Sequence, residues 1–153
     1  MASRRQCVID ILGETDGDPN KGWQTDPAVP TMVLESQTNT LHSYIYNCPD
    51  NGVIVVKKEY DWDPEKLSPT KENRIWTFNV VLINQSETLL DAMFDQFVEV
   101  FDRYTSAPFA TDTNSITYSY ARVVKGVQDP RLPKFVMDCQ IILCEFLSDV
   151  VIA

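Results

Sequence analysis

The clearest hydrophobic pattern along the chain lies between residues 87 and 104, where apolar side chains recur at spacings of three and four. This spacing predicts one main amphipathic helix. Ser86 is a suitable N-cap, and Glu87 is a favourable acid in the first turn. The apolar stripe comprises Leu90, Met93, Phe94, Phe97, Phe101 and Tyr104. A second face gathers Asp91, Asp95, Glu99 and Asp102, which form either an ordinary solvated row or a surface opposite a basic partner or a DNA channel.

The stretch before this helix, residues 74–83, begins with alternation and ends in a continuous apolar run. Its apolar positions, Trp76, Phe78, Val80 and Leu82, share one face of a strand, which favours a strand covered by the helix on that face. Residues 115–124 and 135–146 predict two further strands. The segment 125–134 between them holds three basic residues and two prolines. It is too long for a tight turn, so we expect an extended hairpin tip that contacts a partner.

The N-terminal half predicts three more strands, at 31–38, 41–48 and 53–60. Asn51 and Gly52 separate the last two, and this dipeptide is a strong signal for a β-hairpin. Residues 13–30 and 61–74 are turn-rich or polar and contain prolines, so we expect two long loops there. Trp23 is the large apolar side chain of the first loop, and it anchors that loop either to the core or to a partner.

The fold class predicted by these elements is α+β: a mixed or antiparallel sheet with one face covered by the helix at 87–104, and an additional N-terminal β-hairpin. The chain has 153 residues, which is the size of a single domain, 1–153. Its net charge of −9 argues against nonspecific binding to nucleic acid or to anionic lipid. No apolar run approaches the length needed to cross a bilayer, so we expect a soluble, unsecreted protein without a membrane partner.

The candidate chemistry is sparse, and we expect no enzyme: no catalytic, cofactor-binding or metal site. The sequence has a single histidine, His42, and four cysteines without CxxC spacing. Cys139 and Cys144 are five residues apart, which sends them to opposite faces of a strand and predicts free, buried thiols. One loop places oxygens at Asp16, Asp18 and Asn20 as an EF-hand does, but Lys21 and Pro27 then break that pattern.

Residues 74–147 give strand, helix, strand, long hairpin tip and strand, written WTFNVVLI, SETLLDAMFDQFVEVFDRY and SITYSYARVVKGVQDPRLPKFVMDCQIIL. This half of the chain resembles the tail-terminator proteins of long-tailed bacteriophages and related viruses. Members of that family open with an amphipathic helix that lies on the same sheet, for which residues 4–12 are a short counterpart. A neighbouring neck or tail-completion protein of similar fold is the alternative.

The resemblance implies a structural virion protein of the tail and neck, present in the host cytoplasm during assembly. Its subunits would close into a ring, typically a hexamer, which caps the tail tube and docks it to the head connector. Its partners would be copies of itself, the tail-tube protein and the head-connector protein, with DNA passing through the lumen without specific binding. The acidic row, Asp91, Asp95, Glu99 and Asp102, would face that lumen and repel phosphate.

A ring interface of this kind would use aromatic and basic anchors on the last two strands. The candidates for contact with the next subunit or with the tube are Tyr118, Tyr120, Arg122, Lys125, Arg131 and Lys134. In the alternative interpretation, the tyrosines pack against the protein's own helix. The alternative function is a soluble cellular α+β module that binds a ligand, or a small enzyme, with its site at the edge between helix and sheet.

Overall fold

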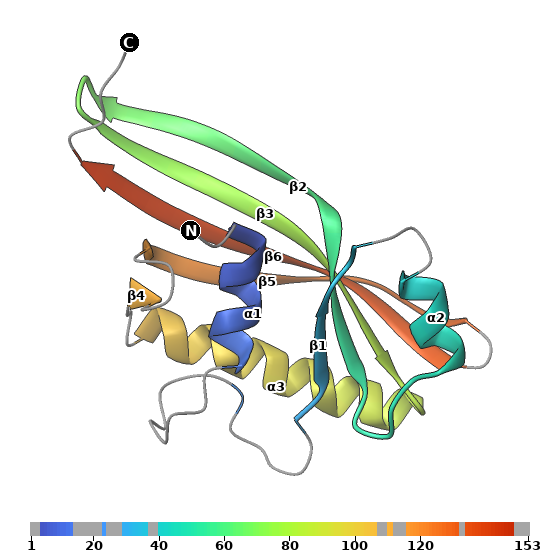
Figure 1. Cartoon of the computed structure of the whole chain (residues 1–153). Coiled ribbons are helices and arrows are strands. Elements are labelled where there is room, and N and C mark those ends of the chain that lie inside the picture. The colour runs from blue at the N-terminus through green and yellow to red at the C-terminus, as the bar shows by residue number, and fades with distance from the viewer. Residues whose placement is uncertain are drawn as a thin grey trace.

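The computed structural model describes residues 4–13, 23, 29–36, 40–106, 110–111, 116–131 and 134–148. The fold is α+β (Figure 1). In chain order its elements are α1 (Arg4–Gly13), β1 (Thr31–Leu34), α2 (Thr40–Tyr46), β2 (Val53–Ser68), β3 (Lys71–Asn84), α3 (Glu87–Ser106), β4 (Ala110–Thr111), β5 (Ile116–Arg131) and β6 (Lys134–Ser148).

The strands form a sheet in the order β1-β2-β3-β6-β5-β4. Strand β1 runs parallel to β2, whereas every other neighbouring pair is antiparallel. The three long strands β2, β3 and β6 continue well past the helices at one end, as Figure 1 shows. The molecule therefore has a body, where helices cover the sheet, and a projecting arm made of β-structure.

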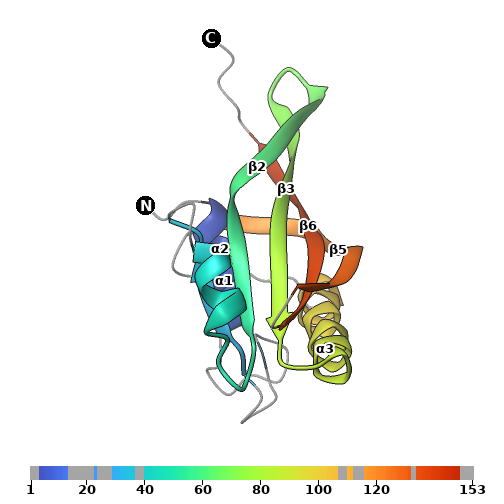
Figure 2. The same cartoon turned by 90° about the vertical axis from the view of Figure 1, so that its right-hand side faces the viewer.

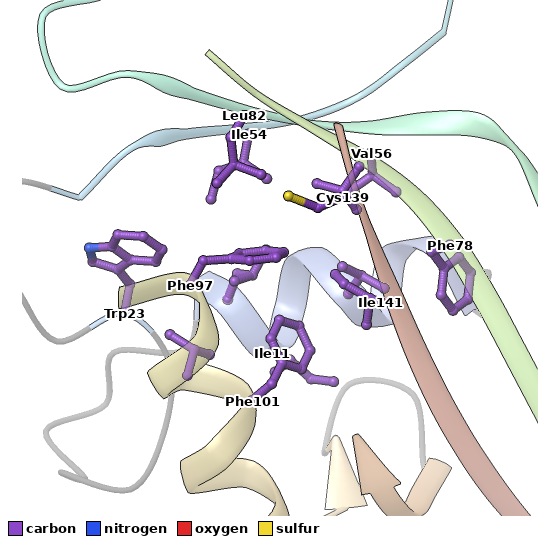
Figure 3. Close-up of a cluster of buried hydrophobic side chains, with 14 of the residues drawn as sticks. Ile11, Trp23, Ile54, Val56, Phe78, Leu82, Phe97, Phe101, Cys139 and Ile141 are labelled. Atoms are coloured by element: carbon purple, nitrogen blue, oxygen red, sulfur yellow. The ribbon is translucent and has the colours of Figure 1, made fainter. Parts of the chain in front are cut away.

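Helices α3 and α1 cover one face of the sheet in the body. The main core joins Phe97 and Phe101 of α3 to Ile11 of α1 and to the alternate residues Phe78 and Leu82 of β3 (Figure 3). Trp76, Phe78, Val80 and Leu82 all belong to this cluster, as the alternation in 74–83 predicts.

Helix α2 covers the other face of the sheet, because the β2 and β3 residues that it packs against alternate with those of the main core. Figure 2 shows α2 beside β2. A second, smaller cluster lies beneath α2 and joins Ile45 and Cys48 to Val55, Val81 and Ile83. This second cover explains why the strand at 74–83 ends in a continuous apolar run: both faces of the sheet are buried there.

The helix predicted at 87–104 is confirmed as α3, and Ser86 caps it as expected. The backbone N–H of Leu89 donates to Ser86 Oγ at 3.2 Å, and the N–H of Leu90 donates to the Ser86 carbonyl at 3.0 Å. Leu90, Phe97 and Phe101 are buried. The amphipathic pattern therefore identified both the helix and the face that packs on the sheet.

The predicted N-terminal β-hairpin is wrong. Residues 41–48, expected as a strand, lie mainly in helix α2, and β1 and β2 run parallel. Leu41, Tyr44, Ile45 and Cys48 carry a helical i, i+3, i+4, i+7 pattern that packs on the second cluster, and this pattern overrode the alternation. Asn51 does lie in a turn, closed by the Gly52 N–H donating to the Pro49 carbonyl at 3.0 Å, but the turn joins a helix to a strand.

The loop predicted at 61–74 is also wrong, because β2 and β3 pair across almost all of it and turn at residues 69–70. The segment 125–134 was predicted as a tip too long for a tight turn. Instead β5 and β6 pair up to Arg131 opposite Lys134, and the sheet extends through the hairpin. In both places the charged residues and prolines of the sequence favoured a loop, although the segment forms a strand with at least one exposed edge.

Trp23 is buried against the main core, which confirms the first of its two expected roles; its backbone N–H donates to the Leu12 carbonyl at 2.8 Å. Most of the predicted loop 13–30 lies outside the described residues. Cys48, Cys139 and Cys144 are buried thiols outside any disulfide. Cys139 lies opposite Val80, and Cys144 lies opposite Ile75, so they take opposite faces of β6 as predicted.

Candidate assembly surface

The outer half of β2 is the part of the arm that is open to solvent. Strand β2 changes character at Val56: residues 53–56 are buried, whereas every residue from Lys58 to Leu67 is exposed. A register irregularity between Val56 and Tyr60 marks the change. Such bulges bend a strand and redirect its side chains. The outer half of β2 is therefore aimed away from the core.

Arg5 of α1 fixes the place where β2 leaves the body. Its guanidinium donates three hydrogen bonds to backbone carbonyls, from Nε to Lys57 at 2.9 Å and from Nη2 to Glu35 at 2.9 Å and Val56 at 3.0 Å. Strand β1 has just ended there, and the Val56 carbonyl also accepts from the backbone N–H of Glu35 at 2.9 Å, so Arg5 reinforces this contact between the two chain segments. The planar fork of arginine suits several acceptors at once. The first helix thereby holds the base of the arm.

An aromatic ladder stabilises the arm on the face that α3 covers in the body. Tyr60 lies directly opposite Phe78, with ring centroids 5.5 Å apart, and Trp62 lies directly opposite Trp76 at the same separation. Tyr60 and Trp62 are 40% and 47% exposed, whereas their partners are buried. Cross-strand aromatic pairs are a main source of stability in an antiparallel pair. The ladder also leaves an apolar surface facing solvent.

Beside the ladder lies a polar cluster whose carboxylates are buried. The indole Nε1 of Trp76 donates to Glu145 Oε1 at 3.3 Å, and Arg74 Nη2 lies 3.6 Å from Glu72 Oε2. The Arg74 guanidinium also lies 5.5 Å from the ring centroid of Trp62. Glu72 and Glu145 are less than a tenth exposed. These contacts orient the ladder.

The sheet ends in a long strand edge on each side. Among the described residues, the outer edge of β2 has no strand partner beyond Val56, and β4 pairs with β5 only at Ile116 and Thr117. Unpaired backbone N–H and C=O groups on such edges can accept a further strand. The two edges belong to different strands, so they are chemically distinct.

Five of the six residues predicted as subunit or tube contacts lie on β5, and the sixth begins β6: Tyr118, Tyr120, Arg122, Lys125, Arg131 and Lys134. Their side chains lie outside the described part of the structure. The backbone register shifts between Tyr118 and Tyr120, which pair with the adjacent residues Glu145 and Cys144. The expected alternation of Tyr118, Tyr120 and Arg122 on one face is therefore interrupted.

The acidic row of α3 is exposed at Asp91, Asp95 and Glu99, while the side chain of Asp102 lies outside the described part. This exposure fits both interpretations of the row. His42 lies in α2, and its side chain is likewise not described. The EF-hand-like residues 16–20 are also outside the described residues. Sequence reasoning missed Tyr60 and Trp62, although the alternation of acid and aromatic in Glu59-Tyr-Asp-Trp-Asp63 is a strand signal.

A cavity of about 320 Å³ lies at the other end of the body, near the start of α3. It is mainly apolar, and a Cβ added at Gly52 would clash with two of its lining residues, Asn84 and Met93. The indole Nε1 of Trp23 is buried there without a hydrogen-bond partner in the described structure. The lining residues are Trp23, Asp50, Asn51, Asn84, Leu89, Ala92, Met93 and Gln96.

No group of three or more His, Cys, Asp or Glu residues within the described ranges is arranged to hold a metal ion. None of the helices in the described ranges is long and apolar enough to cross a membrane. No protein-family model matches the chain. A search of curated proteins likewise finds no significant match.

Proposed function

We propose that this protein is a structural virion protein, a ring-forming tail terminator that caps a viral tail tube and docks it to the head connector. The proposal begins from the resemblance of residues 74–147, whose order of strand, helix and β-hairpin is that of β3, α3, β5 and β6. As a terminator it would work without bond-making chemistry, by presenting surfaces to copies of itself and to the tube.

The observation that carries the proposal is a pair of unlike edges on opposite sides of one sheet, each without a strand partner over most of its length within the described ranges. An interface between two different patches is heterologous, and repeated copies of it form a ring when the rotation closes. Strands β2 and β5 each offer such a patch. The exposed acidic side of α3, with Asp91, Asp95 and Glu99, then suits a lumen through which DNA passes, since like charge prevents the phosphates from binding.

The first test measures the oligomeric mass of the protein in solution and its binding to tail tubes. We expect native mass spectrometry to detect closed oligomers, hexamers by the resemblance, and negative-stain micrographs to contain rings of matching size. Mixed with growing tubes of a viral tail-tube protein that is its partner under the proposal, the protein is expected to bind tube ends and stop their growth. A protein that remains monomeric at all concentrations and leaves tube length unchanged would contradict the proposal.

A second candidate function is binding of a small, mainly apolar ligand, and the cavity near Trp23 favours it. Its volume of about 320 Å³ falls at the lower end of the range for ligand pockets. This candidate predicts that Ala92→Trp, which fills the cavity, abolishes binding of such a ligand while oligomeric mass is unchanged. Thermal shifts measured across a library of small apolar compounds separate the two functions.

A further inference from the structure

Two edges of the sheet that have no strand partner among the described residues, at 60–63 of β2 and 120–123 of β5, match each other over four rows. Register pairs carry the four consecutive positions 60–63 of β2 across β3 and β6 to positions 120–123 of β5. Asp61 lies opposite Thr77, Thr77 opposite Ile142, and Ile142 opposite Arg122. One transverse row therefore begins at an acid on one edge and ends at an arginine on the other.

Three neighbouring rows continue this match. The row of Tyr60 ends at Val123, the row of Trp62 ends at Ala121, and the row of Asp63 ends at Tyr120. An aromatic beside a β-branched residue is a favourable cross-strand pair, and an alanine leaves room for the indole. Near Asp63 and Tyr120 the two pairable stretches end at the same height, whereas at the other end β2 stops at Tyr60 and β5 continues past the matching Val123 to Lys125. On β2, an irregularity precedes Tyr60 and a proline follows Asp63; on β5, irregularities precede Tyr120 and follow Lys125.

The charges of the two edges are opposite. Residues 59–65 of β2 contain four acids and no base, and all seven are exposed. Residues 122–134 contain four bases, Arg122, Lys125, Arg131 and Lys134, and one acid, Asp129. Pairing β2 with β2 of a second copy would place acids against acids, which is unfavourable. Within the four matched rows, pairing β2 with β5 instead places the acid Asp61 opposite the base Arg122, whereas Lys125 lies level with Val56, where β1 already occupies the edge of β2.

We infer that β2 residues 60–63 of one subunit pair with β5 residues 120–123 of the next, and that Asp61 lies opposite Arg122 of that neighbour. This inference rests on the proposed ring. A rotation about an axis parallel to the strands leaves every residue at its own height, so residues of one row meet at the junction. Successive strands alternate in direction from β2 to β5. The new pair is therefore antiparallel, and the sheets of all subunits become continuous.

A cysteine pair tests the register directly. In a Cys7→Ser background, Asp61→Cys with Arg122→Cys is expected to give, under mild oxidation, a ladder of covalent multimers that ends at the size of the ring. A bond within one chain is excluded, because three strand spacings separate the two positions by roughly 14 Å, beyond the reach of a disulfide. The native Cys48, Cys139 and Cys144 are buried.

The matched controls are each single cysteine variant and the pair Glu65→Cys with Arg122→Cys. The second control moves one partner four residues along the same exposed edge, roughly 13 Å away. We expect at most dimers from the single variants and no ladder from the displaced pair. A ladder from the displaced pair that equals or exceeds that of the 61/122 pair would overturn the inferred register.

Charge exchange gives an independent readout. Asp61→Arg and Arg122→Asp are each expected to raise the protein concentration needed for half assembly by about tenfold, because like charges then face each other. The double variant Asp61→Arg/Arg122→Asp is expected to restore most of the lost assembly, because opposite charges face each other again. If the single substitutions acted only by damaging the fold, combining them would not restore assembly. Rings that persist in native mass spectrometry without 61/122 cross-linking or charge rescue would refute this interface and leave the proposed function standing. Failure to assemble, in solution and on tubes, would refute both.

Discussion

Strand β2 passes from a buried region of the protein into an exposed one. Comparing the two regions shows which interactions stabilise the body and which stabilise the arm. Residues 53–56 of β2 are fully buried, with α3 and α1 covering one face and α2 the other. Ten residues farther along, both faces of the same strand are open to solvent. The body therefore depends on helix-to-sheet packing, whereas the arm depends on cross-strand pairs such as Trp62 with Trp76.

The largest effect is expected from a truncation in the body. Phe97 is fully buried at the centre of the main core and packs edge-on against Phe101 at 5.4 Å. Phe97→Ala removes this packing and leaves a cavity, so we expect the free energy of unfolding to fall by about 3–5 kcal/mol. Urea denaturation followed by circular dichroism measures the change. A fall below about 1 kcal/mol would mean that α3 is not the principal cover of the sheet.

A slightly smaller effect is expected where the body is tightest. Gly52 has a φ of 85°, and a Cβ there would lie 2.8 Å from Asn84 Nδ2, 2.9 Å from Met93 Sδ and 3.0 Å from the Ile83 carbonyl. Gly52→Ala combines left-handed strain with overpacking, for a loss of roughly 2–4 kcal/mol. Gly13→Ala is the matched control, since the nearest atom to its Cβ would be Met32 Sδ at 3.7 Å. Equal losses in the two variants would contradict this explanation.

An intermediate loss of stability is expected from a substitution at the junction between body and arm. Arg5→Ala removes three hydrogen bonds to the carbonyls of Glu35, Val56 and Lys57, for a loss of about 2 kcal/mol. We expect faster amide exchange at Lys57–Tyr60 than at Val53–Val56, because only the former segment loses its anchor. Arg5→Lys restores little, since an ammonium lacks the planar fork. Uniformly faster exchange along the whole of β2 would instead indicate global destabilisation.

The smallest effect on stability is expected in the arm. Trp62 is 47% exposed, so Trp62→Ala is expected to change the free energy of unfolding by only about 0.5–1 kcal/mol. If the arm forms the ring junction, the same substitution reduces assembly strongly. Measuring unfolding and oligomeric mass on one preparation therefore sharpens the contrast between the regions. If Trp62→Ala lowered the free energy of unfolding as much as Phe97→Ala does, the contrast between arm and body would be contradicted.

The same contrast explains which parts of the fold the sequence predicted. Helix α3 and the first part of the strand at 74–83 were predicted because burial of one face leaves a clear periodicity in the order of residues. The end of that strand was predicted because burial of both faces leaves a continuous apolar run. The arm was missed because Asp61, Asp63 and Pro64 lie on a strand open on both faces, where burial imposes no pattern. Helix α2 was mistaken for a strand because seven residues are too few to separate two periods.

The candidate surface was predicted only in part, for a related reason. The basic residues of 122–134 stand out in the sequence, and they were identified as contact residues. Their counterparts Asp61 and Trp62 were assigned to a loop, because the charges and prolines of 61–74 outweighed the short alternation of acid and aromatic at 59–63. The row that joins Asp61 to Arg122 depends on the registers of three strand pairs. Such a relation arises only once the whole sheet is assembled.

The two thiols of β6 can report local opening of the sheet, one thiol for each face. Cys139 belongs to the main core and Cys144 lies on the reverse face, and both are almost completely covered. In a Cys7→Ser background, a thiol-specific dye should therefore react slowly with both cysteines. Mass spectrometry of samples taken at successive times should give the rate of modification at each cysteine. If α3 lifts from its side of the sheet first, Cys139 would be modified ahead of Cys144. Chemical labelling could thus follow each side without any engineered probe.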